Sequence, residues 1–101
     1  MTTSALSLVF VDGDIRLVGE ISNQSVLGVI DANLNFSPNK RVVVDFSGVE
    51  RADSAGLALM THWARLAKKS NATIHFEKVP EKLLALAKMS GLDAILSISS
   101  S

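Results

Sequence analysis

Hydrophobic and polar residues alternate in two short runs near the beginning of the chain. The runs cover residues 6–10 and 15–19, and each has the period of two that is typical of a β-strand. Asp12, Gly13 and Asp14 lie between them, and an Asp-Gly pair is a strong signal for a tight hairpin turn. The pattern therefore predicts a β-hairpin.

The next apolar residues recur at helical spacing and predict a first helix, capped by Ser22 or Asn23. Its apolar stripe consists of Val26, Leu27, Ile30 and Leu34. A β-branched run, 42–44, then indicates a central parallel strand, since strands covered on both faces are continuously apolar. We expect Val43, in the middle of this run, to be fully buried, and we expect a loop to open at Ser47-Gly48.

The second half of the chain predicts a further alternation of helices and strands. A helix is expected from Asp53-Ser54 to about Lys69, a strand over 73–76, and a third helix between Pro80 and Gly91. Ile95 and Ile98 predict a last short strand. The order β-β-α-β-α-β-α-β predicts a mixed α/β fold, a β-sheet with helices packed on it. We expect one domain over residues 1–101, with 97–101 as a frayed tail.

Composition and charge narrow the range of functions. Hydrophobic residues make up 48% of the chain and charged residues 20%, which is ordinary for a soluble globular domain. Ten basic and ten acidic residues cancel, so no net positive field favours nucleic acid or an anionic membrane as a partner. No stretch approaches the roughly 20 apolar residues that span a bilayer, so direct membrane insertion is not expected. The chain contains no cysteine, which excludes disulfides and zinc–thiolate sites.

The sequence contains no convincing catalytic set. His62 and His75 fall on different predicted elements, without a second ligand at metal-binding spacing. Asp45 and Asp53 are a candidate carboxylate pair, but each has a simpler role. Asp45 is suited to holding the loop after its strand, and Asp53 to capping a helix. No glycine-rich nucleotide motif is present. We therefore expect no enzyme activity, no metal and no cofactor.

Residues 49–57 include polar residues that packing of the fold alone does not require. Asp53 and Ser54 both suit a helix N-terminus, where a cap contributes about 1 kcal/mol, and Gly56 permits close approach of a neighbouring element. Capping alone is one interpretation. In the other, Ser54 presents its hydroxyl at the positive end of a helix dipole, where an anion or a phosphoryl group is favoured.

Three segments of the sequence resemble the STAS family, which includes the anti-sigma factor antagonists. They are the end of the hairpin at 17–21, the strand at 42–49, and Asp53-Ser54-Ala55-Gly56-Leu57 at the start of a helix. The order of the elements agrees as well. Further likeness over 56–59, 66–69 and 86–88, with His62 and Val79, is to the MlaB-like branch of this family.

The resemblance implies a non-catalytic protein that binds a partner. MlaB-like proteins are small cytoplasmic subunits that bind the ATPase of an ABC complex moving phospholipid, which maintains outer-membrane lipid asymmetry. The chain would then lie at the inner face of the inner membrane through its partner. The alternative is an anti-sigma factor antagonist that a partner kinase phosphorylates on Ser54. Ser54 stands where the MlaB-like pattern has Thr, which keeps this alternative open.

The implied partner surface lies around Ser54 at the start of the second helix. The candidate residues are Asp53, Ser54, Gly56, Leu57, Thr61, Trp63 and Arg65. Thr61 and Arg65 are expected to be exposed, while Trp63 is open to two interpretations, an interface anchor or a core residue. A third function, binding phospholipid directly, is less favoured, because a chain of 101 residues leaves little space for a cavity of about 300–1,000 Å³.

Overall fold

The first two strands form the hairpin that the Asp-Gly turn predicts. The computed structural model describes residues 5–94 and 96–98, and its first elements are β1 (Ser7–Val11) and β2 (Asp14–Ile21), paired antiparallel. Asp12 and Gly13 form the two-residue loop with φ angles of 51° and 86°. Both angles are in the left-handed region, as a hairpin turn of type I′ requires.

The sheet is mixed and has the strand order β1-β2-β3-β4. The strands β3 (Arg41–Ala52) and β4 (Thr73–Glu77) run parallel to β2 and to each other. The loop expected at Ser47-Gly48 was wrong, because β3 continues through these residues to Ala52. Gly48 allows this continuation, since a Cβ atom there would lie only 2.6 Å from the carbonyl oxygen of Leu17 on β2.

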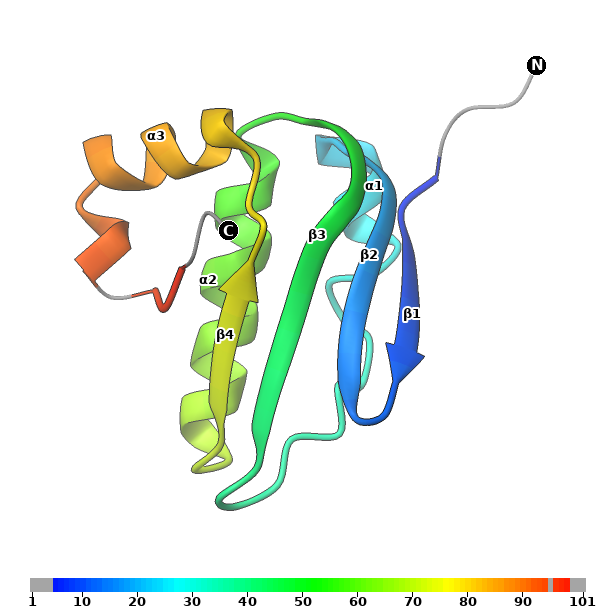
Figure 1. Ribbon diagram of the computed structural model, residues 1–101, viewed down its shortest axis with the longest axis vertical. Coiled ribbons are helices and arrows are strands. Elements are labelled where there is room, and N and C mark those ends of the chain that lie inside the picture. The colour runs from blue at the N-terminus through cyan, green and yellow to red at the C-terminus, as the bar shows by residue number, and fades with distance from the viewer. Residues whose placement is uncertain (1–4, 95, 99–101) are drawn as a thin grey trace.

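Helices cover one face of the sheet. Figure 1 shows α1 (Asn23–Leu27) and α2 (Ala55–Lys69) behind the strands, and α3 (Glu81–Met89) beside the N-terminal end of α2. A short 3-10 helix, η1 (Leu92–Ala94), follows α3. No helix among residues 5–94 and 96–98 is long and apolar enough to cross a bilayer.

The covering of a single face corrects the expectation for Val43. Val42 and Val44 are 0% exposed and point to the helices, whereas Val43 is only half-buried on the opposite face. Asp45 and His75 are also half-buried, and they share this uncovered face with Val43. A run of β-branched residues predicts a central strand correctly, but it does not show how many of its faces are covered.

The first helix is shorter than its apolar stripe suggested. Ser22 caps it as expected: its Oγ accepts a hydrogen bond from the Ser25 backbone N–H at 3.1 Å, and the Ser25 Oγ accepts one from the Ser22 N–H at 2.8 Å. The helix has five residues and ends at Leu27, whose side chain is 73% exposed. Gly28 follows directly, and glycine disfavours helix continuation. Leu34 is buried, but from an irregular segment.

The described C-terminal residues, 96–98, pair with the edge of the sheet through a single bridge. Ile98 makes one isolated parallel bridge with Phe76, and the Phe76 N–H donates a hydrogen bond to the Ser97 carbonyl at 2.8 Å. Ser97 and Ile98, placed in a frayed tail by the sequence, therefore contact β4. Residue 95 and residues 99–101 of the expected strand and tail lie outside the described part of the chain.

Candidate partner-binding surface at the start of α2

The candidate surface begins where β3 ends. The Asp53 N–H donates a hydrogen bond to the carbonyl of Ile21 at 3.1 Å, so the chain stays attached to the end of β2 before turning into α2. The start of α2 thus lies beyond the carboxyl ends of two parallel strands. This edge is where ligands and partners of open α/β sheets usually meet the fold.

Asp53 is the residue that caps α2. Its Oδ1 accepts a hydrogen bond from the Ala55 N–H at 2.8 Å, and its carbonyl accepts one from the Gly56 N–H at 3.1 Å. Ser54 has helical dihedral angles, φ −62° and ψ −16°, and its side chain makes no capping hydrogen bond. Ser54 is exposed, so its hydroxyl lies at the surface without a role in holding the helix start.

Four of the predicted residues share one side of α2. Ser54, Leu57, Thr61 and Arg65 are separated by steps of three or four residues, which places them along one stripe of a helix with 3.6 residues per turn. Ser54 and Arg65 are exposed. Leu57 and Thr61 are half-buried, so Thr61 is less exposed than expected.

Trp63 does not belong to this surface. It follows Ser54 by nine residues, about two and a half helical turns, and therefore lies on the opposite side of α2. Its side chain is 0% exposed and forms part of the core. Its indole Nε1 is buried and has no hydrogen-bond partner among the described residues. The core interpretation of Trp63 is therefore the correct one.

Gly56 is also buried and contacts α3, not solvent. A Cβ atom at this position would lie 2.7 Å from Cδ1 and 3.0 Å from Cδ2 of Leu83, which is itself 0% exposed. The missing side chain thus allows α2 and α3 to pack closely. Gly56 contributes to the candidate surface only by positioning the first turn of α2.

His62, His75, Asp45 and Asp53, the residues considered for chemistry, lie on different parts of the fold. No group of three or more His, Cys, Asp or Glu residues in the described part of the chain could hold a metal ion. His75 Nδ1 lies 2.6 Å from the Ser97 Oγ, and His62 lies on α2, a different element. Asp45 and Asp53 are eight residues apart along extended chain, about 25 Å, so they are not a carboxylate pair.

Asp45 binds the backbone of its own strand, because the loop that it was expected to hold is part of β3. Its Oδ1 accepts a hydrogen bond from the Ser47 N–H at 2.7 Å. Burial on its own would raise the pKa of Asp45. The hydrogen bonds from Ser47 and the positive charges of Lys78 and Arg16 outweigh burial and lower the pKa below its ordinary value of 3.8. This carboxylate is therefore a charged structural group.

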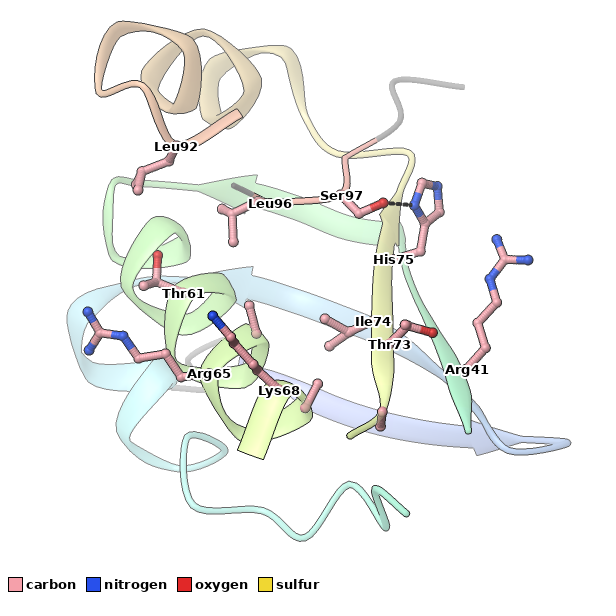
Figure 2. A pocket seen from close by; sticks show the side chains of 13 residues that line it. Arg41, Thr61, Arg65, Lys68, Thr73, Ile74, His75, Leu92, Leu96 and Ser97 are labelled. Atoms are coloured by element: carbon pink, nitrogen blue, oxygen red, sulfur yellow. Dashed lines mark hydrogen bonds between the residues drawn. The ribbon is translucent and has the colours of Figure 1, made fainter. Parts of the chain in front are cut away.

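A groove beside the candidate surface was not expected from the sequence. It has a volume of about 660 Å³ and lies between α2, β4 and the C-terminal segment (Figure 2). The volume is within the range of small-molecule sites, so the chain has more space for such a site than the little that its length suggested. Lys68 lies three residues after Arg65 on α2, so its position beside Arg65 could have been predicted from helical spacing. Arg41, His75 and Leu96 also line the groove, but they are far apart in the sequence, and only the tertiary structure brings them together.

Comparison with known families agrees with the fold and the sequence motifs. Residues 4–97 match the family model described as "Mlab, STAS domain", and the chain therefore belongs to the STAS family. Two curated relatives are each named "Intermembrane phospholipid transport system binding protein MlaB", one from Escherichia coli K12 and one from Shigella flexneri. Each is 41% identical over 51 residues, which cover 50% of this chain and 53% of the relative. The chain thus spans about half the length of the curated relatives it matches.

Solved structures share the fold at low sequence identity. The anti-sigma factor antagonist SpoIIAA in its unphosphorylated form has a TM-score of 0.68 and 18% identity, covering 96% of this chain and 89% of SpoIIAA. A sulfate transporter family protein from Wolinella succinogenes has a TM-score of 0.57 and 17% identity, covering 91% and 80% of the two chains. The mixed α/β fold expected from the resemblance to STAS proteins is confirmed.

Proposed function

We propose that this chain is a non-catalytic STAS subunit that binds the ATPase of a phospholipid-transporting ABC complex through the start of α2. The chain would lie at the cytoplasmic face of the inner membrane through this partner and serve the maintenance of outer-membrane lipid asymmetry. The likeness to two MlaB proteins of an intermembrane phospholipid transport system supports this function.

One observation on the structure carries the proposal. Ser54 is exposed at the helix start while Asp53 makes the capping hydrogen bond, so the Ser54 hydroxyl is available to another molecule. Leu57, Thr61 and Arg65 extend the same side of α2 with apolar, hydroxyl and cationic groups. This mixture of contacts suits a protein partner, since interfaces combine apolar contact with arginine anchors.

Capture of the partner and a charge substitution test the proposal. The tagged chain is used to isolate partners from its own membranes and cytosol, and we expect an ABC-type ATPase subunit in the eluate. Ser54→Glu should leave the melting temperature nearly unchanged, because negative charge at a helix N-terminus is favoured by about 0.3–1 kcal/mol. Affinity for the captured ATPase should fall at least about tenfold, which needs only about 1.4 kcal/mol.

Ser37→Glu is the matched control, because Ser37 is exposed in the loop before β3 and lies outside the candidate surface. It should bind the ATPase like the wild type. Equal binding by Ser54→Glu would show that Ser54 is not part of the interface. An eluate without an ATPase subunit would contradict the proposed function. The non-catalytic role is tested separately: micromolar ATP binding by the isolated chain in calorimetry would contradict it.

A second candidate function is a signalling switch that a kinase operates by phosphorylating Ser54, as in an anti-sigma factor antagonist. The same free hydroxyl supports it, because a phosphoryl group at this position would meet the positive end of the α2 dipole. Mass spectrometry of the chain isolated from its own cells should then show phosphoserine at position 54 and a co-purifying serine kinase. An unmodified Ser54 with an ATPase partner would reject this alternative.

A further inference from the structure

The groove between α2 and β4 has an apolar lining drawn from three parts of the fold. Figure 2 shows Ile74 and Leu96 facing the space between the helix and the strand. The apolar lining residues are Ala64, Ala67, Ala72, Ile74, Leu92 and Leu96. A mainly apolar lining with a few polar groups at its border is the usual character of a small-molecule site.

The charged residues along the groove all have the same sign. Arg41, Arg65 and Lys68 line it together with His75, and none of its described lining residues is acidic. Lys68 lies on the α2 side, while Arg41 and His75 lie on the other side of β4 (Figure 2). Because acidic and basic residues are equal in number over the whole chain, this distribution is a local separation of charge. It favours an anionic occupant.

A second hollow on the surface has more acidic than basic residues in its lining, in contrast to the first groove. It has a volume of about 450 Å³ and is bordered by β2, β3 and the end of β4. Its charged lining residues are Asp12, Asp14, Asp45, Glu77, Arg16 and Lys78. Acidic side chains thus gather at this hollow, whereas the described lining of the larger groove contains none.

The edge of β4 argues against a peptide strand as the occupant. The Phe76 N–H already donates to the Ser97 carbonyl, and Ile98 bridges to Phe76. The Thr73 N–H donates a hydrogen bond to the Lys40 carbonyl, on the β3 side of the strand. Because backbone groups alternate in direction along a strand, only Ile74 directs its backbone N–H and carbonyl outward between Thr73 and Phe76. An added strand would find a single free position there, whereas an alkyl chain needs no backbone partner.

We propose that this groove binds an amphipathic anion with a single alkyl chain and a carboxylate or phosphate headgroup. The alkyl chain would lie on the apolar lining, and the headgroup would lie near Lys68 on the α2 side. This site overlaps the Ser54 surface at Thr61 and Arg65, but Ser54 and Leu57 do not line it. The inference goes beyond the proposed function and does not depend on an ATPase partner.

Titration of the full-length chain, observed through its backbone amide NMR signals, tests the proposal. Dodecanoate and dodecyl phosphate, both below their micelle concentrations, should give saturable one-to-one shifts of amides in residues 64–75 and of Leu92, Leu96 and Ser97. Inorganic phosphate should bind at least about tenfold more weakly, because it lacks the apolar part. Dodecyltrimethylammonium, with the same chain and the opposite charge, should leave these amides unshifted.

Substitutions then locate the site. Lys68→Glu should weaken dodecanoate binding at least about tenfold, while Lys69→Glu, the exposed neighbour that does not line the groove, should stay within about twofold of wild type. Ala64→Leu adds volume to the lining without changing charge and should also weaken binding. Melting curves of all three variants confirm that each remains folded.

Several results would overturn the site. These are no saturable shift with dodecanoate, equal shifts with the cationic detergent, shifts confined to the exposed apolar residues of β1, or an unchanged affinity of Lys68→Glu. Binding of an acidic peptide in the groove without dodecanoate binding would assign it to a protein partner instead. Because Ser54 does not line the groove, Ser54→Glu should bind dodecanoate like the wild type while it loses affinity for the ATPase, which separates failure of this site from failure of the proposed function.

Discussion

Replacing Gly56 with alanine tests the contact that positions the start of α2 against α3. The new methyl group would lie 2.7 Å and 3.0 Å from the two Cδ atoms of Leu83, closer than packed carbon atoms approach. Leu83 is 0% exposed and belongs to the core, so its side chain cannot simply turn out into solvent. The substitution must therefore shift either Leu83 or the helix.

Two opposing effects determine the change in the free energy of unfolding. Alanine is favoured over glycine within a helix by about 1 kcal/mol. An extra methyl group in a close-packed core costs about 1–3 kcal/mol. We therefore expect Gly56→Ala to be destabilising by roughly 0–2 kcal/mol, although the helix propensity alone would make it stabilising.

A double-mutant cycle with Leu83→Ala isolates the contact. Leu83→Ala alone should cost about 2–5 kcal/mol, because it leaves a cavity in the core. In the double variant the Gly56→Ala methyl group would enter that cavity. The double variant should then be more stable than the sum of the single changes predicts, by about 1–3 kcal/mol. Urea denaturation followed by circular dichroism measures all four proteins.

Gly28→Ala is the matched control for the cycle. Gly28 has a helical φ of −75°, and a Cβ atom there would meet only the Ser25 carbonyl oxygen, at the ordinary distance of 3.4 Å. It should be neutral or stabilising, by up to about 1 kcal/mol. The reasoning fails if Gly56→Ala is stabilising to the same extent, or if its effect adds to that of Leu83→Ala within about 0.5 kcal/mol.

Three further predictions follow from β3 and the start of α2. Val44→Thr should lower the free energy of unfolding by about 1–3 kcal/mol, because it buries a hydroxyl without a partner. Val43→Thr, on the uncovered face, should change it by less than about 0.5 kcal/mol. Equal losses in thermal melts would refute the assignment of the two faces. Asp45 has a lowered pKa in the folded chain, so its ionised form stabilises the protein above about pH 4 and this contribution is lost as the pH falls through the folded pKa. Asp45→Asn should therefore be less stable than wild type at pH 7, and the difference should shrink as the pH falls below about 4. A constant difference in melting temperature would contradict the pKa shift. Asp53→Ala should cost about 1 kcal/mol and Ser54→Ala only a few tenths, and the opposite order in urea unfolding would assign the cap to Ser54.

Local signals in the sequence determined the hairpin, the extent of α2 and the family. The Asp12-Gly13 pair specifies its turn because few residue pairs adopt two successive left-handed conformations. The helical period between Asp53 and Lys69 is long enough to define a helix without knowledge of its neighbours. The Asp-Ser-x-Gly-Leu segment at 53–57 indicated both the family and the surface on which the proposed function rests.

Tertiary structure decided which side of each element is covered. The burial of Val43 was predicted wrongly, and the sequence left open whether Trp63 belongs to the core or to an interface. The reason is the same for both, because the sequence does not show whether a hydrophobic residue faces another element or solvent. The groove depends on the packing of α2, β4 and the C-terminal segment, which brings Arg41, Lys68 and Leu96 together from distant parts of the chain. Periodicity reports only on neighbours within a turn or a strand, whereas burial and cavities depend on which elements the whole chain brings into contact.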